Sequence, residues 1–308
     1  MDERLLPVNA AAGLVLRNDI CPAVLADAGF RLVGVEVSVV CGHGRVTADL
    51  VFFADDVSHL LLCEAKAGAH LDEDQARRYS DIDPMNAVDA SRVTITKRVR
   101  PTVEAIYVCL ERHAESIRRG FASAGVEYPL LVLGGDKLTL VGVELASDHL
   151  RWALGSGTVE LKGPPPRLIP FDHESDESII EPFVKAQLVA ELSNRRPSVS
   201  VPMLTERIAP YAAVLGRSAR RVLIRKVGNV CRSIARGDSD TFVYQPPAGN
   251  DDGVMHLRRT PEDNDPRGRT QAYQALARRP GSRTRVPPPD PRQPDLFSEL
   301  DVEDDGQW

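Results

Sequence analysis

The chain has 308 residues, a formal net charge of −6 and a hydrophobic fraction of 43%. This length exceeds one average domain and the apolar fraction is ordinary for a globular protein, so we expect two domains and a polar tail. No apolar run reaches the roughly 18 residues of a membrane span, so the sequence predicts an intracellular protein with no membrane association.

Cysteine usage predicts a reducing compartment, the cytoplasm. The five cysteines lie mostly inside apolar runs, and no two of them form a Cys-x-x-Cys pair. This pattern supports neither a zinc ribbon nor a disulfide framework. The residues concerned are Cys21, Cys41, Cys63, Cys109 and Cys231.

The N-terminal part predicts helices followed by a strand. Spaced apolar residues between Asn9 and Gly29, interrupted at Cys21-Pro22, favour one or two helices. The alternation from Phe30 to Val40 predicts a strand, and Gly42-His43-Gly44 predicts a hairpin turn into a second strand.

Two apolar runs then carry charged side chains. The first reads Thr-Ala-Asp49-Leu-Val-Phe-Phe, and the second, after a turn at 54–56, reads Leu-Leu-Leu-Cys-Glu64-Ala-Lys66. Because side chains alternate along a strand, Glu64 and Lys66 should emerge on one face. Two carboxylates suit a hard cation such as Mg²⁺ (or Mn²⁺), and a nearby lysine can position an attacking water as an ammonium group or deprotonate it as a neutral amine. These groups are the ones that phosphodiester hydrolysis requires.

The order Asp, spacer, Glu-x-Lys resembles the PD-(D/E)xK nuclease superfamily, although Ala48 stands where that motif has proline. Gln75 and Tyr79, four residues apart and therefore on one helix face, resemble the Gln-x-x-x-Tyr motif of the RecB-type branch. The resemblance implies a restriction-endonuclease-like α/β fold, with a mixed sheet of four to five strands flanked by helices.

The same resemblance implies the roles of individual residues. Asp49, Glu64 and the main chain at Ala65 would hold the metal ion, and Lys66 would activate or orient water. The helix that carries Gln75 and Tyr79 would lie over the metal and orient the lysine and the DNA.

Several other residues are weaker candidates. Glu36 is either a further metal ligand or a solvent-facing residue, and Glu3 is weaker still. Among histidines without metal-ligand spacing, only His70 follows the Glu-x-Lys strand closely enough to contact DNA. A basic stretch that contains Lys97, Arg98 and Arg100 is a candidate for phosphate contacts.

The rest of the first domain alternates between strands and helices. We expect a loop at 80–89, a buried strand at 103–110, an amphipathic helix at 111–124, a strand at 128–133 and an edge strand at 138–143. The segment Gly163-Pro-Pro-Pro excludes a helix, so the predicted boundaries are a nuclease-like domain at 1–162 and a linker at 163–173.

A basic second domain is predicted at 174–246. An amphipathic helix at 174–194 comes first, and the stretch 195–237 then contains ten Arg or Lys residues against Glu206 alone. The pattern of a helix at 202–211, a turn at 214–216 and a longer helix at 218–233 capped by Ser218, with a wing strand at 241–244, resembles a winged-helix module.

Basic side chains on the longer helix are the candidates for DNA contact, with salt-dependent and mostly sequence-neutral affinity. They are Arg217, Arg220, Arg221, Arg225, Lys226 and Arg232. The alternative is a small helical domain with a solvated arginine face.

The final segment, 247–308, is rich in Pro, Gly, Asp and Arg, so it is predicted to be disordered. At 293–297 it contains Gln293, Asp295, Leu296 and Phe297, which resemble the peptide that bacterial replication and repair proteins dock on the β sliding clamp. The clamp is therefore a candidate partner, bound through a peptide in a groove.

The leading hypothesis is a Mg²⁺-dependent DNA nuclease, endo- or exonucleolytic, in DNA repair, defence or mobile-element processing. One alternative is a non-catalytic DNA-binding or regulatory protein built on a nuclease-like scaffold. Another is the end-cleaving subunit of a heteromeric transposase, which would need a partner.

Overall fold

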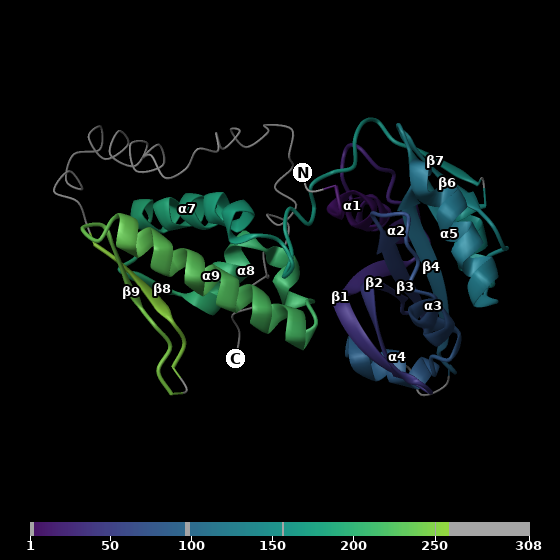
Figure 1. Cartoon of the computed structure of the whole chain (residues 1–308), viewed down its shortest axis with the longest axis horizontal. Helices are drawn as coiled ribbons and strands as arrows, with labels where there is room; N and C mark the ends of the chain where they lie inside the picture. Colours follow the sequence, from purple (N-terminus) through teal and green to yellow (C-terminus); the bar gives the residue numbers. More distant parts are fainter. Residues whose placement is uncertain (1–2, 96–98, 156, 250, 259–308) are drawn as a thin grey trace, which may run out of the picture.

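The computed structural model describes residues 3–95, 99–155, 157–249 and 251–258. In these residues a large mixed sheet with helices on both faces is followed by a smaller part, in which helices pack with a three-stranded antiparallel sheet (Figure 1). The predicted α/β class is confirmed at this level. Lys97, Arg98 and the candidate clamp peptide at 293–297 lie outside the described residues.

The large sheet has seven strands in the order β1-β2-β3-β4-β5-β6-β7, so the predicted number of four to five is wrong. Strand β3 runs parallel to β4 and β4 parallel to β5, and the other neighbouring pairs are antiparallel. The short edge strand β7 was not predicted because three residues carry no readable alternation. The strands are β1 (Phe30–Cys41), β2 (Gly44–Ala54), β3 (His59–Lys66), β4 (Thr102–Leu110), β5 (Leu130–Gly134), β6 (Lys137–Val141) and β7 (Thr158–Glu160).

Helices cover both faces of this sheet and form two separate apolar layers. Helices α1 (Leu5–Gly13), α2 (Val24–Asp27) and α6 (Asp148–Leu154) pack on the face that carries Phe52. Helices α3 (Glu73–Ser80), α4 (Pro84–Ser91) and α5 (Glu111–Ala124) pack on the face that carries Phe53. Neighbouring residues of one strand thus fill opposite layers, as alternation requires.

Helix α4 corrects the loop predicted at 80–89. The side chain of Asp83 accepts a hydrogen bond from the Met85 amide, and Pro84 occupies the first turn. This is a favourable helix start, because proline has no amide hydrogen to leave unpaired there. The same capping geometry begins α3, where Asp72 accepts from the Gln75 amide.

In the described residues, the smaller part has three α-helices, one 3-10 helix and the sheet order β8-β10-β9. Its elements are α7 (Glu177–Ser193), β8 (Ser198–Ser200), α8 (Val201–Ile208), the 3-10 helix η1 (Pro210–Ala213), α9 (Arg217–Gly237), β9 (Phe242–Gln245) and β10 (Val254–Leu257). The strand predicted at 241–244 is confirmed as β9.

Three expectations about this part are wrong. Strand β10 lies in the segment predicted to be disordered, where backbone pairing with β8 and β9 orders it. The helix predicted at 202–211 is divided, since α8 ends at Ile208 before Pro210, which cannot donate a helical hydrogen bond. Helix α9 begins at Arg217 with Gly216 as its cap, so Ser218 does not cap it.

The two parts are joined by backbone hydrogen bonds as well as by the chain. The Val35 amide on β1 donates to the Val214 carbonyl at 2.9 Å, and the Gly216 amide donates to the Val35 carbonyl at 2.8 Å. Residues 163–173, predicted as a linker, pack against α1, where Asn9 exchanges hydrogen bonds with the Ile169 backbone. The start of α9 is therefore held beside β1.

Among the described residues, no helix is both long and apolar enough to cross a membrane.

Candidate active site

The structure brings the five predicted catalytic side chains together where the end of β3 lies beside the middle of β2. Asp49 lies on β2, while Glu64 and Lys66 lie at the end of β3. Gln75 and Tyr79 follow on α3 and share a helix face, as their spacing predicts. Asp49 is anchored by the Ala65 backbone, whose amide donates to its Oδ2 at 2.6 Å.

A break in the alternation of β2 explains how Asp49 reaches this position. Ala48 and Leu50 would share a face in a regular strand, yet they belong to opposite apolar layers. On the partner strand Val35 pairs with Leu50 and Val37 with Ala48, so Glu36 stands opposite Asp49. Glu36 itself has a positive φ of 53°, an uncommon conformation for a residue that is not glycine. The irregularity thus places the carboxyl groups of Glu36 and Asp49 on neighbouring strands, opposite one another.

Hydrogen bonds fix the remaining four side chains relative to one another. The Lys66 ammonium donates to Glu64 Oε1 at 2.7 Å and to Gln75 Oε1 at 3.0 Å. The Tyr79 hydroxyl donates to Glu64 Oε2 at 2.6 Å and also contacts the Thr47 carbonyl at 3.1 Å. Gln75 therefore holds the lysine, and Tyr79 holds the carboxylate with which the lysine pairs.

Asp49, Glu64, Lys66 and Gln75 line a cavity of about 310 Å³, and Tyr79 reaches it through its bond to Glu64. Its walls come from β1, β2, β3, α1, α3 and the segment that precedes α7. Carboxylates outnumber cations among the lining side chains, which makes the cavity suitable for a positive ion. The charged lining residues are Glu36, Asp49, Glu64, Asp172 and Glu174 on the acidic side and Arg4 and Lys66 on the basic side.

The crowding of carboxylates changes their protonation. Burial, followed by the charges of Glu64 and Glu36, raises the pKa of Asp49 well above its usual value, against the opposing effects of the Ala65 amide and Lys66. Burial and neighbouring carboxylates likewise raise the pKa of Glu36 to about 8. A bound cation would favour the ionised form of both groups, because it supplies the missing opposite charge.

Burial and Glu64 raise the pKa of Tyr79, so this hydroxyl stays protonated and can only donate to the carboxylate.

The segment before α7 forms one wall of the cavity, and this wall was not predicted from the sequence. Arg4 bridges Asp172, at 2.6 Å, and Glu174, and these three residues close the cavity opposite the strands. No local motif marks them, since Arg4 and Asp172 are 168 positions apart. Glu3, the weakest metal candidate, pairs with Arg112 and does not line the cavity, and His70 lies exposed beyond β3.

The predicted DNA-binding side chains divide into two groups on α9. Arg217, Arg221, Arg225 and Arg232 are exposed. Arg220 pairs with Glu206, and the half-buried Lys226 donates to the Ser175 carbonyl at 2.7 Å. In the described part of the chain no ion pair engages the first group, so its charges can meet a ligand, and the Arg232 guanidinium also lies over the Tyr244 ring. Arg236, not among the predicted set, is exposed as well.

Comparison with known proteins adds one local similarity. A family model described as the MJECL32 domain matches residues 5–109. About a third of the chain is therefore similar to that domain, from the start of α1 almost to the end of β4, and the match contains all five residues of the predicted site. Neither the search of curated proteins nor the search of solved structures found a match.

Proposed function

We propose that this chain is a Mg²⁺-dependent nuclease that hydrolyses DNA phosphodiester bonds, of the PD-(D/E)xK type that its motif resembles. The observation that carries the proposal is the arrangement of Asp49, Glu64 and Lys66 in one cavity. Groups that lie 15 residues apart meet there, and the lysine is held by two hydrogen bonds beside the carboxylates.

The side chains present fit a magnesium ion. Mg²⁺ binds through one or two carboxylates and keeps several of its waters. Asp49 and Glu64 supply the carboxylates, and a cavity of about 310 Å³ has room for the waters, since each needs roughly 10–15 Å³ of such volume. When bound, the ion would polarise the phosphate and acidify a coordinated water.

The protein's own contribution is to position groups. Lys66, held by Gln75, would orient the attacking water as an ammonium group or, as a neutral amine, take up its proton. Tyr79 would keep the Glu64 carboxylate in one orientation, so that the carboxylate and the lysine act from fixed places. Such preorganisation lowers the cost of reaching the transition state.

The exposed arginines of α9 support DNA as the substrate. With about 100° of rotation per residue, Arg217, Arg221, Arg225, Arg232 and Arg236 fall within roughly 100° of the helix circumference. In the part of the chain that the structure describes, none of them takes part in an ion pair. A row of cations on one helix face is the arrangement that binds a phosphate backbone.

The topology of the smaller part also supports DNA as the substrate. Its order of helix, strand, two helices and two strands, with β10 between β8 and β9, resembles a winged-helix module in which α9 would be the recognition helix. Because α9 begins where Gly216 contacts β1, DNA gripped by its first turns would lie near the cavity.

The test is a plasmid-cleavage assay with Mg²⁺ and with EDTA. We expect cleavage only with the metal, and a loss of roughly 10²–10⁴-fold in Lys66→Met, the range typical for removal of a positioned acid–base group. Asp49→Ala should be inactive, and the exposed Lys162→Met serves as the matched control. Activity that survives both site substitutions would reject the mechanism. Salt-dependent DNA binding without cleavage under any divalent ion would favour the non-catalytic alternative.

A further inference from the structure

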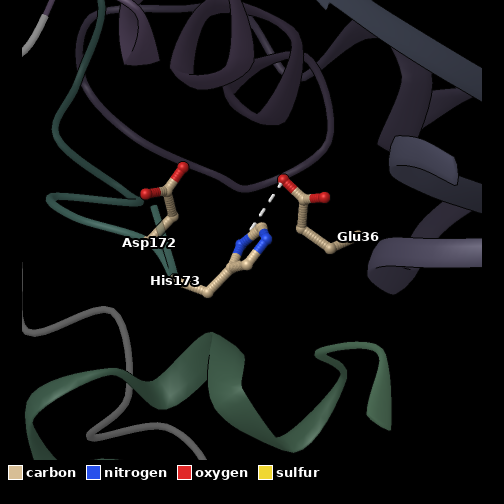
Figure 2. A group of neighbouring side chains, drawn as sticks. All are labelled: Glu36, Asp172 and His173. Carbon is tan, nitrogen blue, oxygen red and sulfur yellow. Dashed lines mark ion pairs between the residues drawn. The ribbon is translucent and has the colours of Figure 1, made fainter. Parts of the chain in front are cut away.

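A second group of possible ligands lies at the junction between the two parts of the chain. Glu36 belongs to β1, whereas Asp172 and His173 belong to the segment that leads into α7. Each offers one ligand atom, and these atoms all lie within 4.8 Å of one another. In Figure 2 the two carboxyl groups flank the His173 ring.

Two of the groups that converge here, the His173 Nδ1 atom and the Glu36 carboxylate, make no hydrogen bond to a described residue. His173 Nδ1 is buried without a partner and lies 4.0 Å from Glu36 Oε1, too far for a hydrogen bond. The Glu36 carboxylate takes part in no hydrogen bond in this part of the chain. Buried polar groups are normally paired, so an unpaired nitrogen facing a carboxylate suggests that a ligand belongs between them.

Asp172 is held in place and still keeps one oxygen available. Its Oδ1 accepts hydrogen bonds from Arg4, from the Ser175 hydroxyl and from the amides of Glu174 and Ser175. All of these bonds go to Oδ1, and no hydrogen bond from a described residue reaches Oδ2, which can therefore serve as a ligand atom. A ligand whose other oxygen is fixed in this way is typical of a metal site, where outer contacts orient the inner ligands.

We propose that Glu36, Asp172 and His173 bind a divalent transition-metal ion, with Zn²⁺ the best fit, which fastens β1 to the segment entering α7. An imidazole nitrogen with two carboxylate oxygens suits Zn²⁺ and related ions, whereas Mg²⁺ prefers an all-oxygen shell. Three protein ligands would leave a further position for water.

The distances are close to those that this assignment needs. Tetrahedral ligands about 2.1 Å from one ion stand about 3.4 Å apart, so Glu36 Oε1 and His173 Nδ1, at 4.0 Å, would have to approach by about 0.6 Å. The widest separation, at most 4.8 Å, would have to close by at most about 1.4 Å, which side-chain rotation can supply.

The site would act as a fastening between the two parts rather than as the centre of hydrolysis. Glu36 directly follows Val35, whose amide and carbonyl bond to the turn before α9. An ion bound by Glu36 and His173 would reinforce this contact. It would also hold the exposed arginines of α9 in one position relative to the cavity. This inference does not depend on the proposed nuclease activity.

The experiment measures Zn²⁺ binding to the full chain in an Asp49→Asn, Glu64→Gln background, which removes the ligands of the first site. Calorimetry should show one Zn²⁺ per chain, with no comparable binding of Mg²⁺. His173→Ala and Glu36→Gln should each weaken Zn²⁺ affinity by more than the roughly 10–100-fold that loss of an outer-shell partner costs. His43→Ala is the matched control, because the His43 side chain is 81% exposed and pairs with Asp81 rather than with the cluster.

X-ray absorption of the Zn²⁺-loaded parent tests the assignment even if a variant fails to fold. One imidazole nitrogen in the metal shell is expected, and an all-oxygen shell would overturn the proposal. No saturable Zn²⁺ binding, or binding that His173→Ala leaves unchanged in a folded protein, would overturn it equally. Zn²⁺ should also slow proteolysis between residues 163 and 176 in the parent but not in His173→Ala.

Discussion

The contact between β1 and the turn before α9 can be tested at one glycine. Gly216 has φ −54° and ψ 144°, values that any residue adopts without strain. A Cβ at this position would nevertheless lie 2.0 Å from the Glu36 carbonyl oxygen. Gly216→Ala must therefore push the two backbones apart by about 1.3 Å, since carbon–oxygen contacts are normally 3.3 Å or more.

This displacement breaks two backbone hydrogen bonds, at 2.8 and 2.9 Å, that join the parts. At about 0.5–1.5 kcal/mol each, their loss costs roughly 1–3 kcal/mol. Alanine would return about 0.4–1 kcal/mol by restricting the unfolded chain. We expect a net loss of about 1–2 kcal/mol in the free energy of unfolding, or roughly 2–8 °C in the thermal midpoint.

The assay is thermal unfolding followed by circular dichroism, together with hydrogen exchange at the Val35 amide. Gly42→Ala is the matched control, because a Cβ there meets nothing within 4 Å. Protection of the Val35 amide should fall in Gly216→Ala alone. If both variants unfold at the same temperature and keep that protection, the close approach of Gly216 to β1 does not stabilise the protein as predicted.

Three further predictions concern the candidate site and the arginine face. Tyr79→Phe removes the 2.6 Å bond to the Glu64 carboxylate and should lower the free energy of unfolding by about 1.5–3 kcal/mol, measured by urea titration; an unchanged midpoint would contradict the role given to Tyr79. Burial raises the pKa of Glu36 from 4.5 to about 8, so in EDTA its contribution to stability is complete below pH 4.5 and is lost as the pH rises through 8. Glu36→Gln should flatten the fall of the thermal midpoint across that range, and a parallel fall in both proteins would show that Glu36 is not responsible. Arg221→Ala should reduce the slope of log affinity for DNA against log salt by about 1, while Lys162→Ala leaves it unchanged; equal slopes in all three proteins would exclude α9 as the phosphate-binding face.

Much of the candidate site could be predicted because its motifs are local. Glu64 and Lys66 share a strand face by alternation, and Gln75 and Tyr79 share a helix face by their spacing, so short-range geometry alone brings each pair together. Asp49 was found from its place in an apolar run. Its final position was not predictable, because the break in alternation between Ala48 and Leu50 has no signature in composition.

The errors in the predicted fold concern short elements that local sequence patterns do not reveal. The loop predicted at 80–89 is a helix because a short stretch with an Asp–Pro start and three buried residues has little periodicity to read. Strand β10 was missed because its four residues gain their order from two partner strands that are distant in sequence or separated by a turn. In both cases tertiary contacts decide what the local pattern leaves open.

By itself the sequence determined the α/β class, the succession of the main strands along the chain, the acidic and lysine side chains on β2 and β3, and the basic helix after the proline-rich segment. These features follow from periodicities of two and 3.6 residues and from charge, which act over a few residues. Only the tertiary structure decided that Arg4, Asp172 and His173 approach Glu36, and that Gly216 meets β1. These groups are joined through space by packing between elements far apart along the chain, and no interaction along the backbone encodes that proximity.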